Sequence, residues 1–460
     1  MSNGSTRALF CQKRPFLIHP IHFISRTPLS DLGNIYDEFE WRGLLFDATP
    51  ELKDVLATES VTAYIGFDPT ASSLHVGSLL PIMGLARLQK FGHSPIALVG
   101  GGTGLIGDPS GKTAERQLLD AEQVQINLEG IRAQLAQFLD FDRASNPAEI
   151  LNNLDWLGEL HLIDFLRDVG KYFTVNYMLS KESVKRRIQS DDGISYTEFT
   201  YMMLQAYDFL ALHRLKKCTL QMGGSDQWGN ILAGTDLIRK ADSAKAHGLV
   251  FPLVTNSSGT KFGKTESGTV WLDPERTSPY KFYQFWMNTD DRDVINYLKY
   301  FTWLTRPEIE AFEKEVEDNP GARAAQKELA LRVTTLVHGA EAYEKALSAS
   351  QVLFGGAIDA LSVSDLKDIF EDVPSTSLSS ATFEGEGIGV LNLCTDTGLT
   401  ASNGEARRLI RSGGLFINSI RIEDENQSIH TKDLIEGQLL VLRKGKRNYH
   451  LVQLGEEEGS

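Results

Sequence analysis

Two short motifs in this sequence carry residue types that suit the binding of a nucleoside triphosphate. The first is Asp68-Pro-Thr-Ala-Ser-Ser-Leu-His75-Val-Gly77-Ser78, where we expect a helix to begin after an apolar strand. The free amides of a helix N-terminus favour phosphate, and a glycine there lets a base or ribose approach the backbone. The second is Lys261-Phe-Gly-Lys264-Thr265, in a loop where paired cations could close on pyrophosphate as its charge develops. Either motif alone would fit a capping histidine or a solvated loop, whereas the pair predicts attack at an α-phosphate.

Three polar side chains share one face of a predicted helix that is otherwise apolar. Tyr201, Gln205 and Asp208 follow one another at i, i+4 and i+7, which places them on the same side of a helix. Such a group can form a hydrogen-bond network inside the core, and it can equally line a pocket for a polar ligand. The spacing leaves both interpretations open.

Two glycine-rich patterns resemble nucleotide motifs but lack parts that those motifs need. Gly102-Thr-Gly104-Leu-Ile-Gly107 fits G-x-G-x-x-G, yet no strand ending in an acidic residue follows about twenty residues later. Gly107-Asp-Pro-Ser-Gly-Lys112-Thr has three residues where a phosphate loop has four, and Pro109 removes an amide. We therefore expect neither a nicotinamide or flavin site nor a phosphate loop, and we interpret these glycines as tight backbone near a ligand.

Alternating strand and helix patterns must position these residues. Strands are expected at 61–67, 94–100 and 219–222 and a helix at 76–90, which predicts a parallel sheet with ligands at the carboxyl ends of its strands. The predicted fold class is therefore α/β: a Rossmann-like parallel-sheet domain with a helical insertion, then an α-helical domain and a small α+β domain. The expected bounds are 34–270 with the insertion at about 115–190, 271–355 for the helices, 356–384 for a linker and 385–460 for the last domain.

Composition excludes several classes of protein. The 460 residues are 42 % hydrophobic and 23 % charged, as in globular proteins, and no run of about 18 apolar residues predicts a membrane span. Three cysteines, Cys11, Cys218 and Cys394, are too few and too far apart for a disulfide framework or a zinc site, which indicates a reducing compartment. No metal-ligand cluster is visible. A net charge of −15 means that any RNA contact must be made by local basic patches.

The two ends of the chain differ from the rest. Residues 1–33 are basic and contain no acidic residue before Asp31, which is typical of a mitochondrial or plastid transit peptide, although a retained disordered leader has the same composition. Near the other end, a capping box at Ser402 and Glu405 begins a helix, and residues 402–450 hold nine basic against six acidic residues. This local excess predicts phosphate contacts, with a solvated basic face as the alternative. The candidate RNA-binding residues are Arg407, Arg408, Arg411, Arg443, Lys444, Lys446 and Arg447.

The motifs together resemble those of a known enzyme family. The two nucleotide motifs are similar to the "HIGH" and "KMSKS" elements of class I aminoacyl-tRNA synthetases. Four further segments resemble tyrosyl-tRNA synthetases of bacterial and organellar type, in the family's order and from about residue 35 onward. They are Tyr64-Ile-Gly-Phe-Asp68-Pro-Thr70, Gly107-Asp108-Pro-Ser-Gly-Lys112-Thr-Ala-Glu-Arg116, Tyr201-x-x-x-Gln205-x-x-Asp208 and Gly223-Gly-Ser-Asp-Gln227-Trp-Gly-Asn.

The resemblance implies a role for each matching residue. Tyr64 and Asp208 would hold a tyrosine phenol, with Gly66 in the same pocket. The substrate's ammonium group would meet Asp108, Tyr201 and Gln205, and its carboxylate side would meet Gln227. The ATP site would be lined by Asp68, Thr70, His75, Gly77, Ser78, Gly224, Asp226 and Lys264. The catalytic residues would be His75, Lys112, Arg116, Lys261, Lys264 and Thr265, and all of these except His75 would stabilise the leaving pyrophosphate.

The resemblance also implies partners and leaves alternatives. ATP accompanied by Mg²⁺ would be a substrate, with L-tyrosine and tRNA(Tyr), in a homodimer acting in organellar translation without a tightly bound cofactor. The C-terminal segment resembles the ribosomal-protein-type RNA-binding module of the family. Ser78 departs from the family, which often has a second histidine there. A tryptophanyl-tRNA synthetase is disfavoured by Tyr64 with Asp208, and a role in intron splicing, added or replacing, remains an alternative.

Overall fold

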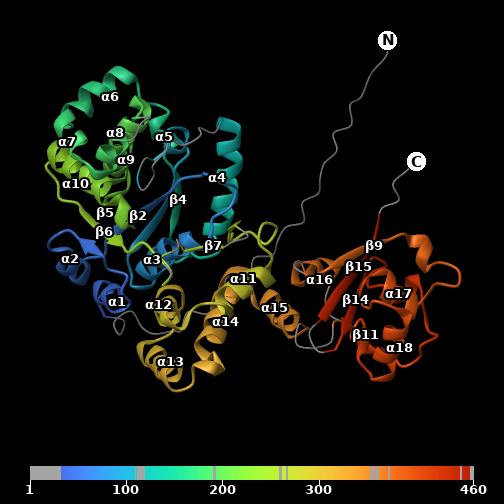
Figure 1. Cartoon of the computed structure of the whole chain (residues 1–460). Coiled ribbons are helices and arrows are strands. Elements are labelled where there is room, and N and C mark those ends of the chain that lie inside the picture. Colours follow the sequence, from blue (N-terminus) through green and yellow to red (C-terminus); the bar gives the residue numbers. More distant parts are fainter. Residues whose placement is uncertain are drawn as a thin grey trace, which may run out of the picture.

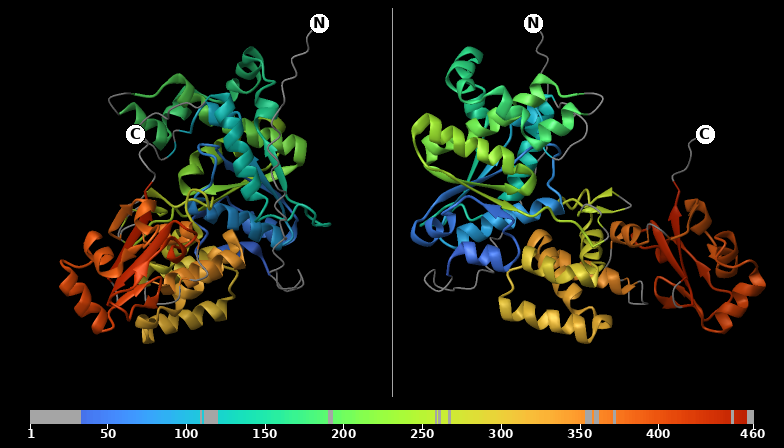
Figure 2. Two further views of the ribbon diagram at one scale, coloured as in Figure 1. Left: turned by 90° about the vertical axis from the view of Figure 1, so that its right-hand side faces the viewer. Right: turned by 60° about the vertical axis from the view of Figure 1, so that its left-hand side comes forward.

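The computed structural model describes residues 33–108, 110, 120–189, 193–257, 259, 262–265, 268–352, 358, 362–370, 373–445 and 448–455. An α/β part, a helical part and a C-terminal sheet domain follow one another along the chain (Figure 1). The C-terminal domain lies beyond the helical part, on the side away from the α/β part (Figures 1 and 2). None of the helices in the described part of the chain combines the length and hydropathy that crossing a lipid bilayer requires.

The α/β part is built on a sheet of six strands in the order β1-β6-β5-β2-β3-β4. All neighbours pair in parallel except the edge strand β1, which is antiparallel to β6. The strands are β1 (Asp47–Ala48), β2 (Thr62–Phe67), β3 (Ser94–Val99), β4 (Glu149–Asn152), β5 (Cys218–Gly224) and β6 (His247–Phe251). The predicted parallel sheet is thus confirmed, but β4 is a strand within a stretch that the sequence predicted to be helical.

Helices cover both faces of this sheet, so its strands are apolar on both sides. Along β2, Ala63 and Ile65 belong to one core cluster and Tyr64 to the other. The helices and turns of this part are α1 (Ile35–Trp41), α2 (Leu52–Thr58), η2 (Val76–Ser78), α3 (Leu79–Lys90), η3 (Thr103–Leu105), α4 (Ala121–Leu135), α5 (Leu154–Leu157), α6 (Leu162–Asp168), η4 (Gly170–Tyr172), α7 (Val175–Leu179), α8 (Glu182–Ile188), α9 (Tyr196–Lys216), η5 (Ser225–Gln227) and α10 (Trp228–Asp242). The helix predicted at 76–90 begins as the 3-10 turn η2, in which His75 is the N-cap, and continues as α3.

A two-stranded ribbon, β7 (Lys264–Thr265) with β8 (Gly268–Thr269), leads from the sheet to the helical part. The helices there are α11 (Pro279–Met287), α12 (Asp291–Phe301), α13 (Arg306–Asp318), η6 (Pro320–Ala322), α14 (Ala324–His338), α15 (Ala340–Val352) and α16 (Val363–Ile369). The start of α11 is fixed by Ser278, whose side chain accepts from the Lys281 amide, and by Pro279 in the first turn. The core of this part is strongly aromatic, with Trp286, Phe282 and Phe301 all buried.

The C-terminal domain has a five-stranded sheet in the order β12-β11-β14-β15-β9. Residues 375–378, which the sequence analysis assigned to a linker, instead form β9, an edge strand parallel to β15. Phe383, from the same expected linker, is 1 % exposed in the core of this domain. A stretch of small polar residues is typical of a linker. An edge strand, however, pairs through backbone groups alone, so this composition does not exclude one. The elements are β9 (Ser375–Leu378), η7 (Ser380–Phe383), β10 (Ile388–Gly389), α17 (Val390–Asp396), α18 (Asn403–Arg411), β11 (Leu415–Ile417), β12 (Ile420–Arg421), β13 (Ser428–Ile429), η8 (Thr431–Asp433), β14 (Leu439–Lys444) and β15 (Asn448–Leu454).

The predicted capping box of α18 is half formed. The Ser402 hydroxyl accepts from the Glu405 amide at 3.3 Å, as expected. The Glu405 carboxylate, however, accepts from the Ala401 amide at 2.9 Å and pairs with Lys444 at 2.6 Å. The β14 lysine, which is distant in sequence, draws the carboxylate away from the Ser402 amide.

Candidate active site

The two nucleotide motifs lie side by side in the structure. The amide of Val76 donates to the carbonyl of Val270 at 3.0 Å, and the Val270 amide donates to the carbonyl of Gly263 at 3.0 Å. Gly263 has φ of +81°, and a Cβ there would lie 2.7 Å from Cγ2 of Val76. The loop of the second motif therefore runs against the turn of the first. Lys264 begins β7, while Lys261, Lys112 and Arg116 lie outside the described residues.

His75 is oriented by its own turn. Its Nδ1 accepts from the Gly77 amide at 3.0 Å, so the neutral imidazole carries its proton on Nε2. A Cβ on Gly77 would lie 2.7 Å from Cε1 of the ring, which explains why this position needs glycine. The backbone of His75 also bridges to Trp271, whose indole meets the imidazole edge-on at 6.2 Å between centroids. This imidazole can therefore donate a hydrogen bond from a fixed position.

Asp68 follows β2 at the carboxyl end of the sheet. Its carboxylate accepts from the Tyr201 hydroxyl at 3.1 Å and from the Thr103 hydroxyl at 3.1 Å. Burial, followed by the nearby carboxylates of Asp68, Asp108 and Asp208, holds the pKa of Tyr201 well above its usual range. Tyr201 therefore remains a hydroxyl donor at neutral pH.

A chain of hydrogen-bonded amide side chains begins at Gln205, which lies one turn after Tyr201 on α9. Gln227 Nε2 donates to Asp108 Oδ2 at 2.8 Å, and Gln205 Nε2 donates to Gln227 Oε1 at 3.2 Å. Asn230 Nδ2 donates to Gln205 Oε1 at 2.9 Å. The structure thus joins Asp108, Gln205 and Gln227, and it adds Asn230, which the sequence analysis quoted but gave no role. Its position one helical turn after Gln227 is the signal that would have found it.

Asp208 lies on α9 and is buried. The residue is 2 % exposed, and its carboxylate accepts from Asn153 Nδ2 at 2.9 Å and from Trp156 Nε1 at 2.7 Å. Burial raises the pKa of Asp208 to about 7, and the two hydrogen bonds oppose that rise. Sequence reasoning missed both donors, of which Asn153 is the N-cap of α5 and Trp156 lies within that helix. The segment Glu149–Asn152 that precedes them has no periodic apolar pattern, so the sequence carried no clear signal for either donor.

Tyr64, on β2, is a neighbour of the Asp208 carboxylate. Its hydroxyl is buried and has no hydrogen-bond partner among the described residues. Burial, followed by the charge of Asp208, holds the pKa of Tyr64 well above its usual range. A buried hydroxyl without a partner is costly, so this atom is suited to a polar ligand group.

The remaining ATP-site candidates surround the same end of the sheet. Gly66 faces open space, since a Cβ there would meet no atom within 4 Å. A Cβ on Gly224 would lie 2.6 Å from Oδ1 of Asp226, so the close contact between this backbone and the Asp226 side chain favours glycine. Thr70 and Ser78 follow Asp68 and His75 in tight turns, through amides that donate to Asp68 and His75 carbonyls at 2.9 and 2.8 Å. Thr265 lies in β7 beside Lys264.

The candidate RNA-binding residues form a separate set in the C-terminal domain. Arg407 and Arg411 both pair with Glu425, at 3.3 and 3.1 Å, and Lys444 pairs with Glu405. The guanidinium of Arg443 stacks on Phe416 at 3.8 Å from the ring centroid. Arg408 is exposed, and Lys446 and Arg447 lie outside the described residues. Ion pairs at an exposed surface are weak, so these cations can exchange a carboxylate for a phosphate.

Comparisons with known proteins agree with this geometry. Residues 56–355 match the family described as tRNA synthetases class I (W and Y), and residues 365–452 match the tyrosine–tRNA ligase SYY-like C-terminal domain. The tyrosine–tRNA ligase of Roseiflexus castenholzii is 57 % identical over 423 residues, which cover 92 % of this chain and 100 % of the relative. Tyrosine–tRNA ligase 1 of Bacillus subtilis is 54 % identical over 92 % of this chain and 99 % of the relative.

Solved structures give the same result. A C-terminally truncated mitochondrial tyrosyl-tRNA synthetase of Aspergillus nidulans superposes with a TM-score of 0.64 at 32 % identity, covering 70 % of this chain and 94 % of that one. The corresponding enzyme of Coccidioides posadasii gives 0.61 at 31 % identity, covering 68 % and 90 %. The first family model alone includes tryptophan enzymes, and the C-terminal model with the close relatives restricts the match to tyrosine. The chain therefore belongs to the class I aminoacyl-tRNA synthetases that act as tyrosine–tRNA ligases.

Proposed function

We propose that this enzyme selects L-tyrosine by its phenol, through Tyr64 and Asp208. The observation that carries the proposal is the buried Tyr64 hydroxyl, which lacks a partner among the described residues and lies beside a buried carboxylate. A tyrosine phenol can donate to Asp208 and accept from Tyr64. Phenylalanine would leave the Tyr64 hydroxyl without a partner and would offer Asp208 no donor, which is a physical basis for strong discrimination against phenylalanine.

The other end of the amino acid would meet polar side chains from α9, η5 and the segment after η3. Asp108, Tyr201 and Gln205 would receive the ammonium group, and Gln227 would lie at the carboxylate side. This arrangement is supported by the hydrogen bonds that already join Asp108, Gln227 and Gln205. An amino acid held at both ends presents its carboxylate in one orientation, which lowers the entropic barrier to attack.

ATP would bind at the carboxyl ends of the strands, around the His75 turn. The lining residues would be Asp68, Thr70, His75, Gly77, Ser78, Gly224 and Asp226, and the pyrophosphate would meet Lys112, Arg116, Lys261, Lys264 and Thr265. Mg²⁺ would accompany the triphosphate, because it favours phosphate oxygens and water over an all-protein site. Its chemical contribution would be neutralisation of phosphate charge.

The reaction would proceed in two steps. A tyrosine carboxylate oxygen attacks the α-phosphorus, and the bond to the bridging oxygen breaks, which gives tyrosyl-adenylate and pyrophosphate. A ribose hydroxyl at the tRNA 3′ end then attacks the tyrosyl carbonyl and releases AMP. The chain's own residues act by alignment and by stabilising charge on the departing pyrophosphate.

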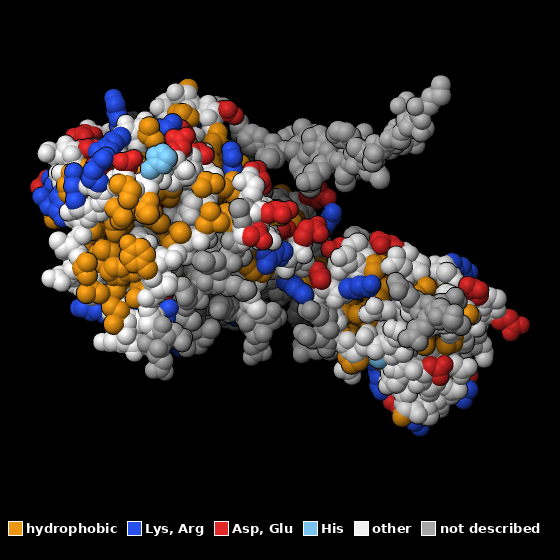
Figure 3. All heavy atoms as spheres, turned by 90° about the horizontal axis from the view of Figure 1, so that it is seen from above, with side chains coloured by type: hydrophobic (Ala, Val, Ile, Leu, Met, Phe, Trp, Pro, Cys, Tyr) orange, Lys and Arg blue, Asp and Glu red, His pale blue; other side chains and the backbone are white. Residues whose placement is uncertain are grey.

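We propose a homodimer whose contact surface includes α6 and α7. Several large apolar side chains there are exposed, among them Leu162 at 69 %, Ile163 at 72 % and Val175 at 61 %. Hydrophobic side chains gather on the corresponding upper face of the α/β part (Figure 3). Exposed apolar patches of this kind favour an interface. Sedimentation of Ile163→Asp should show monomer, and a dimer unchanged in affinity would contradict the assignment.

We propose that the C-terminal domain binds tRNA and that the enzyme acts in an organelle. The basic leader, which has no acidic residue before Asp31, supports the location, as does similarity to two mitochondrial enzymes. A fluorescent fusion of residues 1–40 should accumulate in mitochondria or plastids, and diffuse cytosolic fluorescence would contradict it. The comparisons give no support to a role in intron splicing, which we do not propose.

Substrate selection is tested by amino-acid-dependent pyrophosphate exchange. The wild-type enzyme should exchange with tyrosine and not with phenylalanine. Tyr64→Phe should lower kcat/KM for tyrosine by roughly twofold to tenfold, because a neutral hydrogen bond contributes about 0.5–1.5 kcal/mol. An unchanged kcat/KM would mean that the phenol lies elsewhere.

A further inference from the structure

Phe262 lies between the two lysines of the second motif, yet its ring is buried in the helical part. Only 6 % of the residue is exposed. Four aromatic residues from α11 and α12 surround it, and we call them the aromatic box. Ring centroids lie 5.5 Å away for Phe285, 5.8 Å for Trp286, 5.0 Å for Tyr297 and 5.4 Å for Phe301, the last stacked at 8°. Burial and aromatic contacts therefore fix the loop at this point.

The backbone on the other side of Phe262 contacts the nucleotide site. Gly263 packs on Val76, next to the turn that begins at His75. Lys264 follows and pairs with Thr269 across the ribbon. One residue thus separates the buried ring from the lysine, so a shift of the ring would displace the lysine's backbone.

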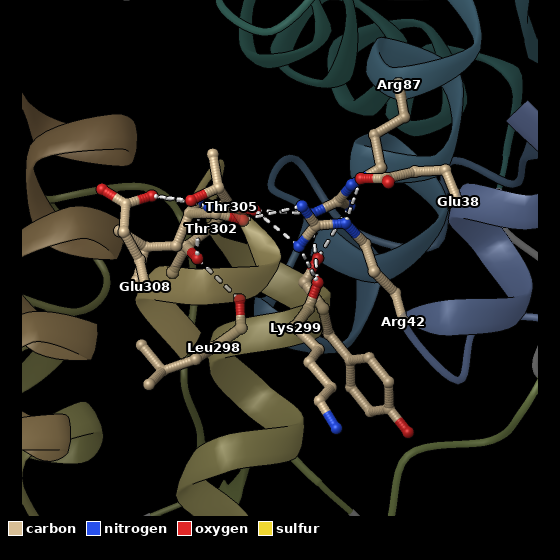
Figure 4. A network of polar contacts seen from close by, with 10 residues as sticks. Glu38, Arg42, Arg87, Leu298, Lys299, Thr302, Thr305 and Glu308 are labelled. Carbon is tan, nitrogen blue, oxygen red and sulfur yellow. Dashed lines mark hydrogen bonds and ion pairs between the residues drawn. The ribbon is translucent and has the colours of Figure 1, made fainter. Parts of the chain in front are cut away.

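The aromatic box is itself fixed to two helices of the α/β part, α3 and α1. Arg87 of α3 donates to the carbonyls of Tyr300 and Thr302 at 2.9 and 2.7 Å, and Arg42 donates to the carbonyls of Lys299 and Leu304 at 2.9 and 2.8 Å. Figure 4 shows both guanidinium groups converging on this end of α12. Cations there satisfy carbonyls that the helix leaves unpaired and complement its dipole. Because Phe301 is the last residue of α12, the two arginines also fix the position of this member of the aromatic box.

The same arginine connects the box to the first motif. Arg87 belongs to α3, which continues directly from the His75 turn. The nucleotide turn, α3, α12 and the loop are therefore joined in a closed circuit of buried contacts. Within that circuit, Phe262 is the contact that reaches the lysines.

We propose that Phe262 is a positioning residue for adenylate formation. Its ring, seated in the aromatic box, sets where Lys264 lies relative to a nucleotide bound at the His75 turn. The inference rests on the proposed role of Lys264 at the pyrophosphate. Because that lysine would act on charge that develops during the reaction, Phe262 affects the rate of adenylate formation and leaves tyrosine binding unchanged.

Single-turnover formation of tyrosyl-adenylate tests this inference. Phe262→Ala should slow the step roughly tenfold to a hundredfold, the loss expected from a misplaced catalytic group, while the tyrosine Kd stays within about twofold. Phe262→Met should restore most of the rate, because methionine fills irregular apolar space. Phe312→Ala removes the same side chain from α13 and should leave the rate unchanged. A parallel loss of tyrosine affinity would overturn the inference.

A double-mutant cycle separates the inference from its premise. If Phe262 acts through Lys264, then Phe262→Ala combined with Lys264→Ala should be no slower than Lys264→Ala alone. Additive losses would overturn the positioning role alone. A wild-type rate for Lys264→Ala would overturn that role together with the proposed function of the loop. If Phe262→Ala folds poorly, Trp286→Leu changes the box from the helical side and must give the same non-additive result.

Discussion

Replacing Trp156 by phenylalanine should weaken the use of tyrosine in a way that depends on pH. Trp156 Nε1 donates to the buried Asp208 carboxylate at 2.7 Å, and burial has already raised the pKa of that carboxyl to about 7. A hydrogen bond to a charged group contributes about 1.5–3 kcal/mol, so losing it should raise the pKa by about one to two further units.

The size of the effect follows from the fraction of carboxylate. At about pH 7.5 the wild-type group is about three-quarters ionised, and a pKa of about 8 to 9 leaves between about a quarter and about a thirtieth. If the phenol donates to the ionised form, kcat/KM for tyrosine should fall about threefold to twenty-five-fold at that pH. The free-enzyme pKa should appear as a shifted acid limb in the pH profile of pyrophosphate exchange.

The pH profile also distinguishes the electrostatic effect from lost packing. At about pH 9.5 both forms are mostly ionised, so the variant should recover most of its kcat/KM. Trp303→Phe removes an indole from the helical part and should not shift the limb. A loss of equal size at every pH would refute the reasoning, since it would mean that the indole acts only by filling space.

Three further outcomes are expected. Because the folded-state pKa of Asp208 is raised, its contribution to stability is present at low pH and is lost as pH rises from about 4 to about 7. Urea unfolding should therefore show the wild type losing stability relative to Asp208→Asn over that range. Parallel plots of unfolding free energy against pH for the two proteins would contradict this. Gly77→Ala, whose Cβ would lie 2.7 Å from the His75 ring, should slow adenylate formation about tenfold or more at unchanged tyrosine Kd, and an unaffected rate would remove the imidazole from the mechanism. Ending the chain before Val373 removes the whole C-terminal sheet including β9. This truncation should preserve pyrophosphate exchange but lower both tRNA charging and the salt dependence of charging. Full charging in moderate salt would instead assign RNA binding to the helical part.

The sequence alone determined the elements that carry their own pattern. The apolar runs of β2, β3 and β5 predicted a parallel sheet, because strands buried on both faces lack polar positions. The motif residues, their order and their glycines also predicted where ligands would approach. The spacing of Tyr201, Gln205 and Asp208 placed three polar groups on one helix face, and the structure shows that each of them has a hydrogen-bond partner on another element.

The tertiary structure decided what lies far apart in sequence or lacks a periodic pattern. The four half-buried residues of β4 have no strand signature, so the sequence missed both that edge strand and Asn153 beside it, 55 residues from Asp208. The strand β9 was read as a linker for the same reason, since its pairing uses backbone groups that every residue has. Phe262 shows most clearly what local sequence patterns cannot predict. Its neighbours predicted a loop of cations that closes on pyrophosphate. Only the packing of α11 and α12 reveals that its ring is buried, because local spacing reports which face is apolar but not what covers it.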